Sequence, residues 1–429
     1  DDKQQIIGVD AVSGIDQTLD LCRGVISSRS KVFNQPVFTE TVCHPNEDMI
    51  AAKVSSPLFK EGKLKIKLHF PYPTGQNTDD PCDWNATDKH TTLIIKQGDN
   101  FAVLERILDD TQYYVRVDWT GKAKLSKKED HYFLLIPESD GLSFLVAFST
   151  DKPVRSSETF DKILAESSNY WEKYWQNGGF IDLGESSDIR AKELERRIIL
   201  SQYLMAIQCA GDFPPQETGL TYNSWYGKFH LEMHWWHGVH FALWNRTELL
   251  ERSLSWYSTV VDKAAETARR QGFDGVRWMK MTDLSGNESP SDVGPFLIWQ
   301  QPHLIYMTEL IYRQGQSPEI IEKYKDLVFK TADFMASFVK LDDENNRYVL
   351  KGLIPAQETM KPSETVNPPF ELSYWHYGLS LAQQWRERAG LERNEKWDDI
   401  INRLSGLAAK DGLYLAAESA PQTYSDIRF

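Results

Sequence analysis

Residues 217–240 read ETGLTYNSWYGKFHLEMHWWHGVH, and this stretch is the most informative in the chain. Its 24 residues hold three Trp, two Tyr, four His, two Glu and one Lys. Aromatic faces stack on sugar rings, and carboxylates, imidazoles and ammonium groups hydrogen-bond the hydroxyls around the ring edge. A buried, aromatic-rich helix start is the alternative, and it would explain one Trp better than it explains the whole cluster. The stretch therefore predicts a carbohydrate-binding site.

The length and the charge of the chain narrow the class of protein. At 429 residues the chain exceeds the usual limit for one hydrophobic core, so we expect two domains or three. The net charge of −14 argues against a nucleic-acid partner, because phosphate neutralisation needs a basic face. No run of about 18 apolar residues occurs, so we expect no membrane span. A neutral sugar is compatible with all of these observations.

The cysteines give no sign of a metal site or a cofactor. None of the four has the C-x-x-C spacing of a zinc site, so we expect neither a metal nor a cofactor. Cys82 could pair with Cys22 or Cys43, or the thiols could be free. The oligomeric state also stays open, with a homodimer as one possible assembly.

Residues 1–155 have the pattern of a β domain. Short segments alternate between apolar and polar residues, with turns between them, which is typical of a half-buried antiparallel sandwich. We therefore expect a β-sandwich domain over 1–155. The segments that show the alternation best are 37–42, 63–70, 91–96, 113–119, 132–137 and 142–148.

Helical patterns replace the alternation after residue 156. Ser156 and Ser157 predict the cap of a helix that runs to about Gln176, and we assign 156–186 as a linker helix. A second, long helix is expected over roughly 187–210. Further helices are expected near 231–244, 247–271, 300–315, 318–340, 371–390 and 395–408.

Helical hairpins with long loops favour an (α/α)6 barrel, a ring of six hairpins, over 187–429. The sequence predicts about seven helices after the linker, so we expect the chain to stop inside this domain. The fold class is therefore multidomain β + α, an antiparallel β-sandwich followed by an (α/α)6 domain. Three loops, 212–228, 272–299 and 342–370, are too long for plain connectors and are candidate functional loops.

The first of these loops, with the helix start that follows it, supplies most of the candidate sugar contacts. At helical spacing Glu232 and Trp236 share one face, which could line a cleft. The residues that we assign to sugar binding here are Trp225, Lys228, Glu232, His234 and Trp236.

The second and third loops add further candidates. Trp278, Lys280 and Gln301 suit sugar contact, although Gln301 could equally cap the next helix. Glu358 follows an apolar run and precedes a polar loop, where it could serve as a general acid, a role that needs a carboxyl held protonated. A solvated loop glutamate is the alternative. Glu371 has a similar claim, but its place at a helix N-terminus explains it as a dipole-compatible residue.

Residues 217–237 resemble glycoside hydrolase family 65, in particular its bacterial members of the kojibiose hydrolase type. The segments 299–303 (WQQPH) and 354–358 (IPAQE) fit the same group, and the resemblance covers roughly 160–429. It implies a β-sandwich, a linker helix, an (α/α)6 catalytic barrel and a small C-terminal β domain. It also implies inverting cleavage of α-glucosides, either by water or by phosphate.

The resemblance also implies roles for two carboxylates. Glu358 ends a segment similar to the Gly-Pro-Asp/Asn-Glu pattern of the phosphorylases, so the resemblance implies that it is the general acid. Glu232 stands where the phosphorylases carry the Asp of a Trp-Asp pair, so it would hold hydroxyls of the glucose whose bond is cut. This departure favours the hydrolases. An inverting hydrolase needs a second carboxylate about 6.5–9.5 Å from the acid, which we expect beyond Phe429.

The leading hypothesis is an inverting glycoside hydrolase that cleaves α-linked gluco-oligosaccharides such as kojibiose-type disaccharides. Two alternatives stay open: a disaccharide phosphorylase of the same family, and a catalytically inactive glycan-binding relative. A degradative role in a glycan-scavenging bacterium would suit a periplasmic or secreted protein.

Overall fold

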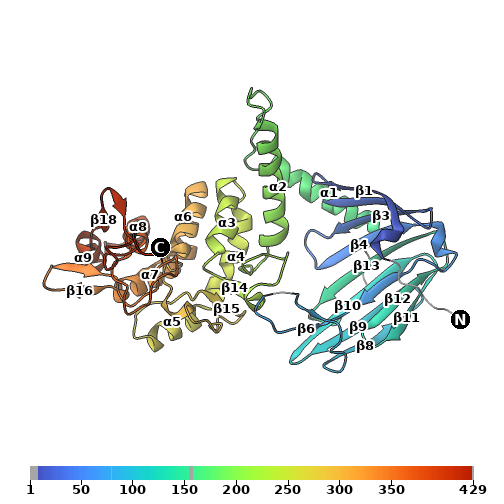
Figure 1. Cartoon of the computed structure of the whole chain (residues 1–429), viewed down its shortest axis with the longest axis horizontal. Coiled ribbons are helices and arrows are strands. Elements are labelled where there is room, and N and C mark those ends of the chain that lie inside the picture. The colour runs from blue at the N-terminus through green and yellow to red at the C-terminus, as the bar shows by residue number, and fades with distance from the viewer. Residues whose placement is uncertain (1–7, 79, 154–157, 428–429) are drawn as a thin grey trace. The chain divides into compact units, whose positions relative to one another are not determined.

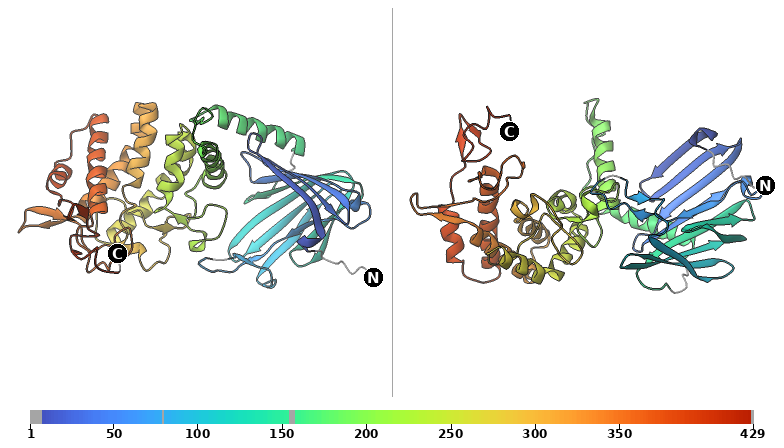
Figure 2. Two further views of the ribbon diagram at one scale, coloured as in Figure 1. Left: turned by 45° about the horizontal axis from the view of Figure 1, so that its top comes forward. Right: turned by 60° about the horizontal axis from the view of Figure 1, so that its bottom comes forward.

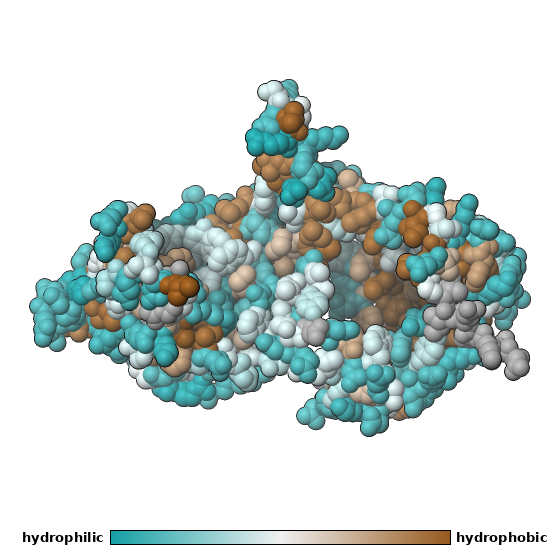
Figure 3. Space-filling view, in the orientation of Figure 1, coloured by the Kyte–Doolittle hydropathy of each residue, from teal (hydrophilic) through white to brown (hydrophobic). Residues whose placement is uncertain are grey.

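The structure is a computed structural model that describes residues 8–78, 80–153 and 158–427. The chain divides into two compact units (Figure 1): Asp1–Gly75 with Asp80–Gly178, and Gln76–Asp79 with Gly179–Phe429. Hydrophilic side chains cover most of the surface seen in Figure 3, and hydrophobic ones form separate patches. Among the described residues, no helix is long and apolar enough to cross a membrane.

The first unit consists of two main antiparallel sheets. The larger has eight strands in the order β1-β2-β3-β4-β13-β10-β9-β8, and the smaller has three in the order β11-β12-β5. The strands of the large sheet are β1 (Val12–Asp20), β2 (Val25–Val32), β3 (Gln35–Cys43), β4 (Met49–Ser55), β8 (His90–Gln97), β9 (Phe101–Leu108), β10 (Thr111–Thr120) and β13 (Gly141–Ser149). Those of the small sheet are β5 (Ile66–His69), β11 (Ala123–Glu129) and β12 (Tyr132–Pro137); short elements are η1 (Val9–Ala11), η2 (Pro57–Phe59), β6 (Tyr72–Pro73) and β7 (Cys82–Asp83).

One hydrophobic core joins the two sheets. Val115 and Val117 of β10 share this core with Phe133 and Leu135 of β12, and all four are fully buried. Alternate residues of these strands point into the core, so the alternation in the sequence correctly predicted an antiparallel β domain. Five strands of the two sheets were not among the predicted segments: β1, β2, β4, β9 and β11. In β1 and β2 most residues are polar and at least partly exposed, which hides the alternation.

Helix α1 (Phe160–Gln176) lies across the large sheet (Figure 2), on the face opposite the shared core. Its Phe160 and Ile163 are buried against Val25 and Leu145. Thr159 caps the helix, because its side chain accepts a hydrogen bond from the Lys162 N–H. The expected cap at Ser156 and Ser157 lies outside the described residues.

The second unit is helical, as expected for the C-terminal part of the chain. Its helices are α2 (Ala191–Cys209), α3 (His234–Leu243), α4 (Thr247–Thr259), α5 (Val261–Arg270), α6 (His303–Gly315), α7 (Pro318–Phe338), α8 (Pro369–Arg388) and α9 (Glu395–Arg403). Its short elements are η3 (Trp225–Gly227), β14 (Phe229–His230), β15 (Met281–Thr282), η4 (Gly294–Phe296), β16 (Lys340–Asp342), β17 (Arg347–Val349), β18 (Ala409–Lys410) and β19 (Leu413–Tyr414).

The helix predicted over 247–271 is wrong as one element. Val260 takes φ −118° and ψ 12°, outside the helical region, and buries its side chain, so the segment breaks into α4 and α5. The described residues of this unit form eight helices, α2 to α9, and the closed ring of six hairpins stays a prediction.

Candidate active site

Three segments that are distant in sequence meet at the side chain of Lys280. Its Nζ lies 3.1 Å from Oε2 of Glu232, just before α3, and 2.9 Å from Oε1 of Glu358, in the loop before α8. Glu232 and Lys280 are buried, whereas the side chain of Glu358 is 36% exposed. A lysine held between two carboxylates, one of which reaches solvent, is the centre of the candidate site.

A two-stranded sheet fixes Lys280 beside Glu232. β14 pairs with β15 through Phe229 opposite Thr282 and His230 opposite Met281, and the N–H of Glu232 donates to the carbonyl of Lys280 at 3.3 Å. The side chains of Glu232 and Lys280 therefore project from two neighbouring backbone segments that are hydrogen-bonded to each other. Short strands of this kind were not expected from the sequence, because two residues are too few to show a pattern.

The loop that carries Glu358 holds that residue in an unusual backbone conformation. Glu358 has φ +57°, in the left-handed region, which is uncommon for a residue other than glycine. Its N–H donates to the carbonyl of Pro355 at 2.8 Å. The N–H of Ala356 donates to Oε1 of Glu371 at 2.6 Å. Backbone strain of this kind persists only where neighbouring contacts maintain it, and it is a feature of functional loops.

The charges of the cluster support one another. Burial alone would lower the pKa of Lys280, but Glu232 and Glu358 outweigh burial and raise it. Burial would raise the pKa of Glu232, but His230 and Lys280 outweigh it and lower that pKa. His230 Nε2 lies 3.3 Å from Oε2 of Glu232 without the alignment of a hydrogen bond, so we treat this as an electrostatic contact. Glu232 is thus a carboxylate, and Lys280 a cation, at neutral pH.

Trp225 stacks on the cluster. The ammonium of Lys280 lies 5.0 Å from the centre of the Trp225 ring, within cation–π range. Trp225 and Tyr226 have φ +50° and +59°, so a second left-handed turn adjoins the site. Trp225 is partly exposed and can offer ring surface to a ligand.

Many buried polar atoms of these segments have no hydrogen-bond partner among the residues that the structure describes. Such atoms are rare in proteins and call for water or a ligand as a partner. Buried water or a polar ligand would satisfy them. They are both ring nitrogens of His230, His237 Nδ1, Thr282 Oγ1, Ser289 Oγ, Trp299 Nε1, Gln300 Oε1, Thr359 Oγ1 and Glu371 Oε2.

The structure brings together four of the nine site residues expected from the sequence, Trp225, Glu232, Lys280 and Glu358. Trp236 lies at the first turn of α3, with 49% of its surface exposed. Lys228 is partly exposed. Burial would raise the pKa of Asp283, but hydrogen bonds from Asn287 and Ser285 lower it, and the charge of Lys228 adds a smaller lowering effect.

The other three expected residues, His234, Trp278 and Gln301, belong to the core, which corrects our assignment. His234 is fully buried, and its ring nitrogens lie 3.0 Å from the Tyr257 hydroxyl and 2.8 Å from Ser253 Oγ. Burial lowers its pKa to about 3, so it is a neutral core histidine.

Trp278 and Gln301 stabilise each other. The indole N–H of Trp278 donates to Thr331 Oγ1 at 3.0 Å. The side-chain carbonyl of Gln301 accepts a hydrogen bond from the backbone N–H of Trp278 at 3.0 Å. The side-chain amide of Gln301 donates to the backbone carbonyl of Val276 at 2.6 Å. Both side chains are buried, and their polar atoms are already bonded to groups of the protein.

Two residues that hold the segments of Glu232 and Glu358 in place were not among the site residues expected from the sequence. His303 Nε2 lies 3.1 Å from the carbonyl of Glu232, and its Nδ1 lies 2.9 Å from the Tyr374 hydroxyl. Glu371 accepts the Ala356 N–H, as described above. Each lies in a segment that the sequence singled out, but their partners are between 15 and 71 residues away, so local sequence could not reveal the contacts.

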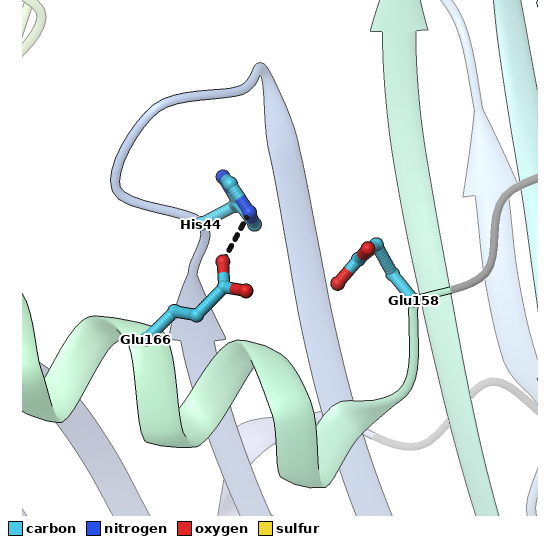
Figure 4. Close-up of side chains that lie close together, drawn as sticks. All are labelled: His44, Glu158 and Glu166. Atoms are coloured by element: carbon cyan, nitrogen blue, oxygen red, sulfur yellow. Dashed lines mark ion pairs between the residues drawn. The ribbon is translucent and has the colours of Figure 1, made fainter.

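In the first unit, His44, Glu158 and Glu166 are the one group of described residues with the spacing of a metal site (Figure 4). The Asn46 N–H donates to His44 Nδ1 at 3.1 Å, so the neutral ring carries its proton on Nε2, which faces Glu166 at 2.8 Å. A metal would need the lone pair of that nitrogen. Lys162 already bonds Glu158 at 2.5 Å. The group therefore fits an ion-pair network between α1 and the sheet.

All four cysteines are free.

No protein-family model matches the chain, and no curated protein matches its sequence. Solved structures do resemble its fold. A proposed kojibiose phosphorylase from the human microbiome is 11% identical over 95% of this chain and 59% of its own, with a TM-score of 0.69. A bacterial glucoamylase complexed with acarbose is 12% identical over 94% of this chain and 61% of its own, with a TM-score of 0.50.

A family GH92 α-mannosidase from Bacteroides thetaiotaomicron is more distant, at 12% identity and a TM-score of 0.39. At these identities the likeness to the first two structures, both of glycoside-processing enzymes, concerns the fold alone. The chain spans about three fifths of the length of the first two structures.

Proposed function

We propose that the protein is an inverting glycoside hydrolase that cleaves α-linked gluco-oligosaccharides, with kojibiose-type disaccharides among its substrates. The observation that carries the proposal is the single ammonium of Lys280 bonded to both Glu232 and Glu358, with the Trp225 ring against it. Charged hydrogen-bonding groups beside an aromatic face suit a pyranose ring with its hydroxyls.

The burial of the three groups suggests their roles. Glu232 and Lys280 are buried, held charged by each other, and suited to fix hydroxyls of the glucose unit. Glu358 is the exposed member of the group and can take up a proton from solvent, which it would then give to the oxygen of the leaving sugar. Trp225 would stack on the glucose.

The distances argue against Glu232 as the water-activating base. The nitrogen–oxygen distances of 3.1 and 2.9 Å limit the separation of the two bonded oxygens to their sum, 6.0 Å. An inverting pair needs about 6.5–9.5 Å to admit water between the carboxyl groups. Because the ammonium of Lys280 lies between the two oxygens where that water would have to stand, we assign Glu232 to binding and expect the base elsewhere in the protein. A retaining pair, at about 5–5.5 Å, is the stereochemical alternative that the experiment separates.

The test is proton NMR of the protein with a panel of α-linked glucose disaccharides, with and without phosphate. β-Glucose as the first product, without phosphate, is the expected result, and the substrate that yields it names the linkage. α-Glucose as the first product would overturn inversion. No product from any disaccharide, with binding retained, would favour the glycan-binding alternative.

A disaccharide phosphorylase is the second candidate, favoured by the fold likeness to a proposed kojibiose phosphorylase. The two reactions differ in the nucleophile, which is water in one and phosphate in the other. β-Glucose 1-phosphate that forms only when phosphate is present would assign this activity instead.

The role of Glu358 has its own test. Glu358→Gln should lower disaccharide turnover by about 10²–10⁴-fold, the usual contribution of a general acid. The same variant should retain activity on α-glucosyl fluoride, because fluoride leaves without protonation. Glu364→Gln, an exposed carboxyl in the same loop, is the matched control and should change neither rate. Equal loss of both activities in Glu358→Gln would contradict the assignment.

A further inference from the structure

Trp299 lies beneath the loop that carries the proposed acid. It is 5% exposed and belongs to a buried cluster with Leu297 and Ile354, against which Ala356 also packs. Leu297 and Ile354 are bridged in parallel, and the Ile354 N–H donates to the Phe296 carbonyl at 3.0 Å. The indole of Trp299 is therefore fixed relative to the segment that ends in Glu358.

Two exposed aromatic rings rest on Trp299. The centre of the Trp236 ring lies 5.4 Å from that of Trp299 with an interplanar angle of 81°, and Phe370 lies at 6.0 Å and 69°. Despite these contacts, Trp236 and Phe370 are 49% and 50% exposed. Large aromatic rings that remain half exposed on a buried partner have surface available for another molecule.

These rings are placed beside the carboxylates by the helices that carry them. Trp236 lies in the first turn of α3, shortly after Glu232, and Phe370 lies in the first turn of α8, which follows the loop of Glu358. His303, which lies 3.1 Å from the Glu232 carbonyl, also packs edge-on against Trp299 with ring centres 5.0 Å apart. Trp299 therefore connects the environments of both carboxylates.

One polar atom of Trp299 and one in the loop of Glu358 have no hydrogen-bond partner among the described residues. The indole nitrogen of Trp299 and Oγ1 of Thr359, the residue after Glu358, are both buried without a hydrogen-bond partner in the described structure. A ligand with an apolar face and peripheral hydroxyls would satisfy both kinds of surface, and a pyranose has this chemistry.

We propose that Trp236, Trp299 and Phe370 form the subsite for the leaving-group sugar, the unit on the far side of the bond that is cleaved. The inference rests on the proposed function. A general acid protonates the bridging oxygen and so lies between the two sugars. Glu232, Lys280 and Trp225 hold one sugar, and the aromatic group beside the Glu358 loop holds the other. The ligand class is a neutral pyranose.

The test compares substrates with and without a leaving sugar. Trp236→Ala and Phe370→Ala should each raise KM for the α-linked disaccharide roughly tenfold, which corresponds to the loss of one stacking contact. Both should leave kcat and KM for α-glucosyl fluoride unchanged, because that substrate does not enter the subsite. Trp236→Tyr, which retains an aromatic face, should restore most of the affinity. Leu243→Ala, at an exposed position of the same helix, is the control for α3.

A binding experiment keeps this inference separate from the proposed function. In the Glu358→Gln background, calorimetry should show weaker disaccharide binding after either aromatic substitution and unchanged binding of free glucose. That result would support the subsite even if wild-type protein turned over neither substrate, an outcome that contradicts the proposed function. Equal losses for glucose and disaccharide, or unchanged disaccharide binding, would overturn the subsite. A fall in melting temperature with equal loss on both substrates would overturn it too, because it would indicate that another part of the protein covers these rings.

Discussion

The carboxyl of Glu371 accepts a hydrogen bond from the backbone N–H of Ala356 at 2.6 Å and so joins the start of α8 to the loop that carries Glu358. Glu371 is fully buried, and its Oε2 has no partner among the described residues. Burial raises its pKa to about 7, against the opposing effect of the backbone N–H groups. A glutamate that the sequence explains as a helix-start residue therefore supports the proposed acid.

Glu371→Gln should remove part of the pH dependence of stability. In the wild type the folded state holds a proton that the unfolded chain loses above its usual pKa of about 4.5, so stability falls as the pH rises toward about 7. Gln keeps the carbonyl oxygen for Ala356 but cannot ionise. Between pH 4.5 and 7.5 the free energy of unfolding in urea should fall by up to roughly 3 kcal/mol more in the wild type than in the variant.

The matched control for this prediction is Glu364→Gln, at an exposed position before α8, which should keep the wild-type slope. If the free energy of unfolding changed with pH in parallel for wild type and Glu371→Gln, burial would not raise the pKa of Glu371, and the prediction would be wrong.

Lys280→Met should destabilise the protein most at neutral pH. The substitution leaves the buried Glu232 without its cation, and removal of one partner of a buried pair typically costs about 3–5 kcal/mol. In the wild type the pKa of Glu232 is lowered, so its stabilising contribution is present above its unfolded pKa and is lost in acid. The stability difference between wild type and variant should therefore shrink from pH 7 to pH 4, as measured by urea unfolding.

The double variant Glu232→Gln/Lys280→Met tests the cause of that loss. Because it contains no buried charge at this position, it should recover much of the stability lost in Lys280→Met. A double variant as unstable as Lys280→Met at pH 7 would show that packing of the lysine stem, and not the unpaired carboxylate, sets the cost.

Glu358→Gly should be more stable than Glu358→Ala. Both substitutions remove the carboxylate and its bond to Lys280. The difference in stability between the two variants therefore reports the cost of the backbone conformation at this position. The left-handed φ of +57° costs a non-glycine residue about 1 kcal/mol, which glycine avoids. Thermal unfolding of the two variants should differ by about that amount. Equal stability would show that the loop relaxes when the side chain is lost, and that no strain is maintained at this position.

The sequence predicted the general architecture because its signals are local. Alternation along β10 and β12 reflects one face buried in a shared core, and it can be read without knowledge of the partner strand. The dense polar and aromatic loops likewise pointed to Glu232, Lys280 and Glu358, which the structure brings together. A lysine between two carboxylates was not predictable, because 78 residues separate Lys280 from Glu358 and no local pattern encodes their distance.

The three misassigned sugar contacts, His234, Trp278 and Gln301, have one physical origin. An aromatic or amide side chain in a loop suits a sugar and a protein interior equally well. Trp278 is buried, and Thr331 of α7, 53 residues away, accepts its indole N–H there. Such partners are set by the packing of helices, to which a local reading of residue types has no access.

Gln301→Ala should therefore affect stability and leave sugar binding intact in the protein that remains folded. The substitution leaves the Trp278 N–H and the Val276 carbonyl buried without partners, and each unsatisfied group costs about 1–3 kcal/mol. We expect a loss of about 3 kcal/mol in urea unfolding, with KM for the disaccharide within about twofold of wild type at low temperature. Gln422→Ala, at an exposed position, should change stability by less than about 0.5 kcal/mol. A raised KM at unchanged stability would return Gln301 to the sugar-binding residues, where the sequence first placed it.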